Sequence, residues 1–104
     1  MRADAAQVFA ALGDGVRLSL VTRLSAGGPA SIVRLTEGAG MTRQAVTKHL
    51  AVLERAGLAR RTRLGRESLW EVDREGLTTV EAWLDLMSRQ WDDRLDALRS
   101  LVEG

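Results

Sequence analysis

The sequence predicts a mainly α-helical domain that carries one small β-hairpin. Three observations lead to this fold class. Apolar residues recur at helical spacing through most of the chain, alternation at every second residue is confined to residues 58–72, and glycine clusters separate the apolar segments. Of the 104 residues, 45% are hydrophobic and 28% are charged, so we expect one folded domain over residues 1–104.

The first two helices are expected in residues 5–24. Asp4 can cap the first helix, whose apolar positions are Ala5, Val8, Phe9 and Leu12. The Gly-Asp-Gly sequence at 13–15 breaks this helix, and Asp14 can cap a second helix over residues 16–24. Residues 25–31, which include the only proline, are expected to form a loop.

Residues 31–56 are typical of two helices joined by a tight turn. A short helix over residues 32–38 leads into Gly-Ala-Gly at 38–40, where positive φ costs little. The next helix is expected to begin at Thr42, a good N-cap, and to end at Ala56 before Gly57. Its apolar residues lie within about 60° of one another, and the opposite face is polar. The apolar residues are Val46, Leu50 and Leu53, and the opposite face carries Gln44, Thr47, Lys48, Ala51 and Arg55.

From residue 58 the sequence pattern changes from helical spacing to alternation at every second residue. Leu58, Arg60, Thr62 and Leu64 alternate with their neighbours, as do Glu67, Leu69 and Glu71. Gly65 and Arg66 lie between the two runs, which predicts a β-hairpin with Gly65 in its turn.

The last helix is expected over residues 74–102. Its apolar stripe covers about 100° of arc and about 38 Å of length at 1.5 Å per residue. A domain of this size cannot cover such a stripe, so we expect a homodimer built on the first and last helices. The stripe contains Leu77, Val80, Leu84, Met87, Trp91, Leu95, Leu98 and Val102, and the predicted interface comprises Val8, Phe9, Leu84, Met87, Trp91, Leu95 and Leu98.

The charge is concentrated although the net charge is only +1. Residues 41–66 hold seven cations and one acid, a balance of +6, and residues 67–104 hold four cations and ten acids, a balance of −6. A short helix, a glycine turn, a capped helix and a basic hairpin together predict a winged helix-turn-helix, with the helix-turn-helix at 31–56 and the wing at 58–72. The major groove of DNA admits one α-helix, which predicts double-stranded DNA as the partner. The candidate contacts are Thr42, Arg43, Gln44, Thr47, Lys48, His49, Arg61, Arg63 and Arg66.

Several of these side chains have a second interpretation. The cations could form an ordinary solvated surface, and a winged helix can also bind protein. His49 lies about 60° from the centre of the apolar stripe, which favours a half-buried ring bonded to a backbone group or phosphate over a metal ligand. Trp83 and Trp91 are expected to pack in the core or the dimer interface rather than to line an effector pocket.

Composition narrows the function classes further. The chain has no cysteine, which removes thiolate ligands, disulfides and cysteine nucleophiles and fits a cytoplasmic protein. No apolar run reaches the roughly 20 residues of a membrane helix, and the N-terminus lacks a secretory pattern. His49 has no accompanying nucleophile, so we expect neither an enzyme nor a cofactor.

The sequence resembles the ArsR family of winged-helix transcriptional regulators over nearly its whole length. The resemblance is carried by ALGDGVRLSLVTRL at 11–24, MTRQAVTKHLAVLERAGLARRTRLGRE at 41–67 and the helix to the end. It implies a homodimeric DNA-binding protein, usually a repressor of promoters that include its own. The metal-sensing Cys-x-Cys pair of some members is replaced here by Ser-Ile-Val-Arg-Leu at 31–35, and the last helix has no histidine. The resemblance is therefore to the metal-independent branch, with a small-molecule or metal effector as the alternative. The family's Asp-Pro-Thr-Arg appears as Asp14 to Arg17, which places Arg17 near the DNA backbone or an internal acid.

Overall fold

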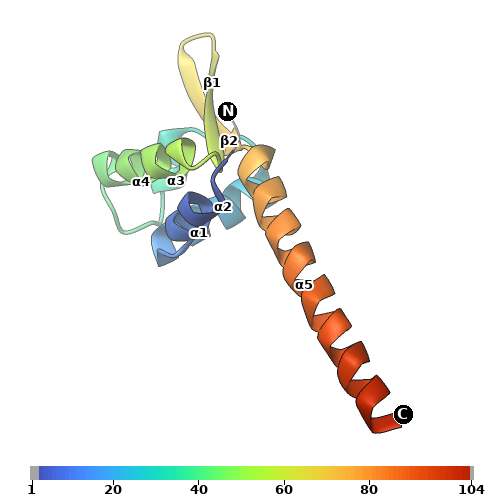
Figure 1. The fold of residues 1–104 in the computed structure, drawn as a ribbon. Coiled ribbons are helices and arrows are strands. Elements are labelled where there is room, and N and C mark those ends of the chain that lie inside the picture. The colour runs from blue at the N-terminus through green and yellow to red at the C-terminus, as the bar shows by residue number, and fades with distance from the viewer. Residues whose placement is uncertain (1–2, 104) are drawn as a thin grey trace.

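The computed structural model describes residues 3–103. The first four helices and a hairpin pack together at one end, and the last helix projects away from them, so that the molecule measures 67 × 30 × 21 Å (Figure 1). The five helices and the antiparallel hairpin confirm the predicted fold class. In chain order the elements are α1 (Ala5–Leu12), α2 (Gly15–Gly27), α3 (Ile32–Thr36), α4 (Arg43–Arg55), β1 (Ala59–Leu64), β2 (Glu67–Val72) and α5 (Arg74–Glu103).

The ends of the helices follow from capping side chains and glycines. Asp4 accepts a hydrogen bond from the N–H of Ala6 at 2.8 Å, which confirms the predicted cap of α1. The predicted end of α2 at residue 24 was wrong, because the helix continues to Gly27 and shortens the expected loop. Gly28, with φ of 78°, ends α2, and its N–H donates to the Leu24 carbonyl at 3.0 Å. Helix α3 is also shorter than predicted and ends at Thr36.

One hydrophobic core joins α1 to α4 with the base of the hairpin. The predicted apolar stripe of α4 is completely buried in it, with Val46, Leu50 and Leu53 all at 0% exposure. Burial of a side chain of this size stabilises the folded state by about 1.5–3 kcal/mol relative to exposure. The core therefore fixes which side of α4 faces outward. The remaining core residues are Val8, Ala11, Leu20, Val21, Leu24, Leu35, Ala56, Leu58, Ala59 and Trp70.

The hairpin pairs from Ala59 opposite Val72 to Leu64 opposite Glu67. Gly65 and Arg66 form the predicted two-residue turn, and Gly65 has φ of 64°. Positive φ at the first turn position alone is the pattern of a type II′ turn, which suits the strand twist. Trp70 anchors the base of the hairpin, because it is 3% exposed and exchanges main-chain hydrogen bonds of 2.8 and 2.9 Å with Ala30.

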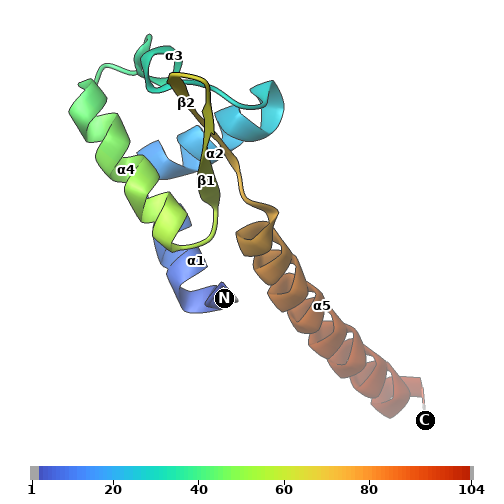
Figure 2. The same ribbon diagram turned by 90° about the horizontal axis from the view of Figure 1, so that it is seen from above.

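Helix α5 touches the rest of the domain only near its beginning. Leu77 and Val80 pack on the core, and Trp83 meets Phe9 of α1 edge to face at 5.1 Å. Every residue from Ser88 to Glu103 is exposed. Figures 1 and 2 both show this distal half extending away from the other elements. The distal part of the apolar stripe of α5, from Trp91 to Val102, therefore lacks a partner within its own chain.

Candidate nucleic-acid interface

Helix α4 has one buried side and one open side. Of the six side chains predicted to contact DNA from this helix and its cap, five are exposed and His49 is half-buried, while the apolar stripe is buried. Five residues that can donate or accept hydrogen bonds are thus exposed near the start of the helix. We call this set the α4 polar face: Thr42, Arg43, Gln44, Thr47 and Lys48.

The two threonines of the α4 polar face also have local roles. The Thr42 hydroxyl oxygen accepts a hydrogen bond from the N–H of Ala45 at 3.1 Å, as expected of an N-cap. The Thr47 hydroxyl donates to the Arg43 carbonyl at 2.8 Å, which leaves its lone pairs and methyl group on the surface. His49 is half-buried at the flank of this face, which matches the burial expected from its position.

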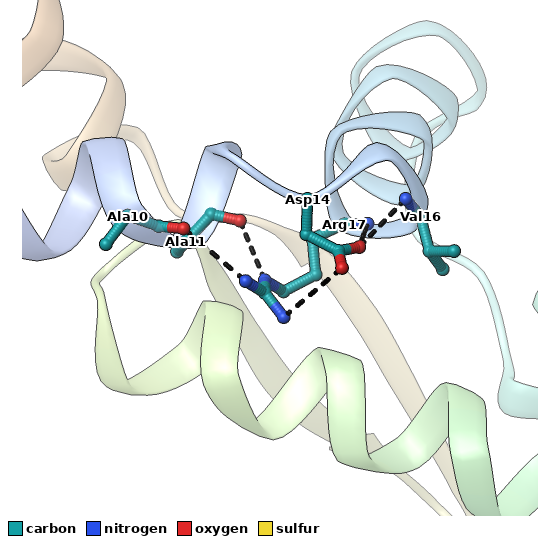
Figure 3. Close-up of polar contacts among 5 residues, drawn as sticks. All are labelled: Ala10, Ala11, Asp14, Val16 and Arg17. Atoms are coloured by element: carbon teal, nitrogen blue, oxygen red, sulfur yellow. Dashed lines mark hydrogen bonds and ion pairs between the residues drawn. The ribbon is translucent and has the colours of Figure 1, made fainter.

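The connection between α1 and α2 is held by Arg17 (Figure 3). Its Nε donates to the Ala11 carbonyl at 2.7 Å, and one terminal nitrogen donates to the Ala10 carbonyl at 3.4 Å. The other terminal nitrogen lies 3.9 Å from the Asp14 carboxylate. A cation at the C-terminus of a helix satisfies carbonyls that have no partner within the helix. Of the two surroundings expected for Arg17, the structure places it beside the internal acid.

The Asp14 carboxylate is the cap of α2, as predicted. Its Oδ1 accepts hydrogen bonds from the N–H groups of Val16 and Arg17, at 2.9 and 3.1 Å. The pKa of Asp14 is lowered, chiefly by the hydrogen bond from the Arg17 amide. Desolvation, the second-largest effect, raises the pKa, while the charge of Arg17, the Val16 amide and the charge of His49 each lower it further. The carboxylate is thereby kept in its ionised, capping form.

A second arginine of α2 holds α3, the helix before the glycine turn. The terminal nitrogens of Arg23 donate to the carbonyls of Leu35 at 2.9 Å and Arg34 at 3.2 Å. This arginine was absent from the predicted site because its partners lie 11 and 12 residues away. Gly38 and Gly40 then turn the chain into α4 with positive φ, as predicted.

The hairpin arginines divide into two groups. Arg60 pairs with Glu71 across the strands at 2.8 Å, and the Arg61 guanidinium lies 5.8 Å from the centre of the Trp70 ring. Arg63 and Arg66 lie at the exposed tip, where Nε of Arg63 donates weakly to the Gly65 carbonyl at 3.4 Å. The alternation in the sequence predicted the strands, but it did not predict that the Arg61 guanidinium would lie over the Trp70 ring.

The predicted interface residues outside this region also have definite surroundings. Five of them are accessible: Phe9 is 37% exposed, Leu84 50%, Trp91 62%, Leu95 50% and Leu98 61%. Met87 is half-buried. Val8 differs, because it is completely buried within its own chain and has no surface to offer a partner.

Residues 3–103 show neither of two other kinds of site. No group of three or more His, Asp or Glu side chains converges there in a way that could hold a metal ion. None of the helices in this range is long and apolar enough to cross a membrane.

Comparison with known proteins agrees with this architecture. Residues 12–62 match the family model described as a helix-turn-helix domain. The HTH-type transcriptional regulator Rv2034 of Mycobacterium tuberculosis is 32% identical over 98 residues, which cover 94% of this chain and 88% of that protein.

Two solved structures are similar as well. The ArsR-like transcriptional regulator from Rhodococcus sp. RHA1 superposes with a TM-score of 0.80 at 32% identity, covering 93% of this chain and 91% of that one. A protein of Mycobacterium bovis, described as a homodimeric winged helix-turn-helix DNA-binding domain and a possible ArsR-family regulator, shares the fold with a TM-score of 0.65 at 24% identity, covering 82% and 78%. The arrangement of α3, α4 and the hairpin, together with these relatives, shows that the chain belongs to the ArsR family of winged helix-turn-helix transcriptional regulators.

Proposed function

We propose that this regulator binds a pseudo-palindromic DNA operator as a homodimer and represses transcription by occupying promoter DNA. The observation that carries the proposal is the two-sided character of α4. One side is completely buried through Val46, Leu50 and Leu53, and the other presents the α4 polar face to solvent. A helix held in this way fits the major groove with its donors toward the base edges.

Within the α4 polar face, the chemistry of each side chain suggests its role. Gln44 can form two hydrogen bonds with adenine, and Lys48 can contact guanine or a phosphate. Thr42, Arg43 and Thr47 lie close to the helix N-terminus, where phosphate is favoured. His49 lies at the flank and would contact a phosphate.

The hairpin is proposed as the wing. Arg63 and Arg66 at its tip would reach the DNA backbone or the minor groove. Arg61 shares this basic surface, and its position over Trp70 would preorganise it for the same contact. We accordingly assign residues 31–56 to the helix-turn-helix, 58–72 to the wing and 74–102 to dimerisation.

The dimer is supported by the uncovered stripe of α5. Leu84, Trp91, Leu95 and Leu98 lie on one side of the helix and are each at least half exposed. A contiguous apolar surface of this kind marks an interaction site. The homodimeric description of the Mycobacterium bovis domain supports a second copy of this chain as the partner. Two copies of α4 would then meet successive major grooves about 34 Å apart.

The decisive experiment is selection of bound sequences from random double-stranded DNA, followed by gel shifts with the selected site. We expect an inverted repeat and a complex containing two chains. Gln44→Ala should relax selectivity at one position of each half-site, whereas Arg99→Ala, on the exposed distal part of α5, should leave selectivity unchanged. Failure to enrich any sequence at low salt would instead favour a winged helix that binds protein.

A further inference from the structure

The junction between α4 and α5 is made by main-chain atoms. The N–H of Gly76, in the first turn of α5, donates to the carbonyl of Gly57 at 2.7 Å. Gly57 follows the C-cap of α4, and the next carbonyl, that of Leu58, accepts from the Asp73 N–H at 2.9 Å. The segment that follows α4 is therefore bonded directly to the beginning of α5.

Gly76 leaves no room for a side chain at this junction. A Cβ atom there would lie 2.6 Å from the Gly57 carbonyl oxygen and 2.9 Å from Cδ2 of Leu58. Gly76 is also the one buried residue of α5. Glycine inside a helix is about 1 kcal/mol less favourable than alanine, so helix propensity does not explain it. The close approach of the two backbones explains why position 76 is a glycine.

Gly57 is constrained from the opposite side. Its φ is 79°, a left-handed conformation that ends α4, and a Cβ there would lie 3.1 Å from the Cβ of Ala3. Ala3 immediately precedes Asp4, the cap of α1. The segment that leaves α4 is thus enclosed between the start of α1 and the start of α5, the two helices expected to form the dimer.

We propose that Gly76 is a positioning residue that sets the distance between the two copies of α4 and thereby selects the spacing of the DNA half-sites. This inference rests on the proposed function, in which α5 joins the two copies and α4 reads DNA. Helix α5 extends about 40 Å beyond Gly76 at 1.5 Å per residue. A small change of direction at its first turn is therefore magnified along the interface, and each α4 is displaced relative to its partner.

The test compares Gly76→Ala with Gly27→Ala. Gly27 is also helical, but a Cβ at that position would meet nothing within 4 Å. Operators are prepared with the spacer lengthened or shortened one base pair at a time, together with a duplex that carries a single half-site. We expect Gly76→Ala to bind the wild-type spacing about tenfold more weakly or worse, because misaligning even one contacted base pair has an effect of that size. Its preferred spacing should change, while single half-site affinity and dimerisation stay as in wild type and Gly27→Ala.

The distance between the two copies of α4 can also be measured in the absence of DNA. The chain contains no cysteine, so Glu54→Cys places one spin label on the exposed side of α4 in each copy. The label-to-label distance in the dimer should shift or broaden in Gly76→Ala and remain unchanged in Gly27→Ala. If Gly76→Ala does not fold, the same comparison is made with Gly57→Ala, which displaces the same junction from its other side because a Cβ at Gly57 would lie 3.1 Å from the Cβ of Ala3.

The outcomes separate the two proposals. An unchanged spacing preference and label distance in a folded Gly76→Ala dimer would overturn the role of Gly76. Equal loss of half-site and full-site affinity would also overturn it, because that result indicates a structural role only. A wild-type protein that binds no DNA would overturn the proposed function itself.

Discussion

Nε of Arg17 in α2 donates to the main-chain carbonyl of Ala11 in α1 at 2.7 Å. The arginine thus closes the end of the preceding helix, while the Asp14 carboxylate caps the beginning of its own. Since α1 is proposed to meet the partner chain and α2 supports α3 through Arg23, this hydrogen bond links the two functional ends of the domain.

Arg17→Ala should lower the free energy of unfolding by about 1–2 kcal/mol, because carbonyls at the end of α1 would be deprived of a charged donor that is largely shielded from solvent. Urea unfolding followed by circular dichroism measures the effect. Arg34→Ala, which removes an exposed arginine of α3, is the matched control and should change the value by less than about 0.5 kcal/mol. Equal effects of the two substitutions would mean that the hydrogen bonds of Arg17 contribute nothing to stability.

Acidification should weaken the domain through Asp14. Its pKa in the folded state lies below the ordinary value of 3.8, so the ionised group stabilises the fold at neutral pH. This contribution disappears as the pH falls below about 4 and through the lowered pKa. Asp14→Asn keeps a capping side chain but removes the titrating group, and it should flatten this part of the stability profile. Urea midpoints measured between neutral pH and about pH 3 test this, with Asp93→Asn on exposed α5 as the control. Parallel profiles for wild type and Asp14→Asn would exclude the effect.

The salt dependence of DNA binding should report the proposed phosphate contacts. Arg66→Ala and Lys48→Ala should each reduce the slope of log affinity against log salt by about 0.9 for every phosphate that the variant no longer neutralises. Filter binding to the selected operator at several salt concentrations gives the slope. Arg99→Ala, far from both the hairpin and α4, should leave it unchanged. A slope and an affinity equal to wild type in both test variants would place the DNA on another surface.

Dimer formation should depend on Trp91. Replacing this 62% exposed tryptophan with glutamate puts a charge in the centre of the α5 stripe, and we expect an 11.4 kDa monomer in sedimentation equilibrium at micromolar concentration. Gln90→Glu adds the same charge about 100° around the helix, away from the stripe, and should remain dimeric. A wild-type protein that sediments as a monomer would contradict the proposed assembly.

The parts of the fold that sequence reasoning predicted are those decided locally. Thr42 as a cap, Gly65 in the turn and the burial of Leu50 each depend on residues within one helix or hairpin. The interactions that sequence reasoning did not predict join segments that are far apart in the sequence. The pairing of Ala30 with Trp70 and the bond between Gly57 and Gly76 have no signature in spacing or hydrophobicity, because their partners are brought together only by the complete fold.

The same division applies to the candidate site. Periodicity identified the outward side of α4, since direction on a helix follows from position alone. It did not separate Arg61, which has a partner on β2, from Arg66 at the tip. That distinction requires the strand register, which places Glu71 opposite Arg60 and Trp70 opposite Arg61.

The three tryptophans occupy three different environments. Trp70 is 3% exposed in the core, Trp83 is 43% exposed against Phe9, and Trp91 is 62% exposed on the distal part of α5. The intrinsic emission of the chain is therefore the sum of three contributions, each sensitive to a different event. Unfolding of the domain would shift the emission of Trp70 to longer wavelength, separation of α1 from α5 would change that of Trp83, and association of two chains would move that of Trp91 to shorter wavelength.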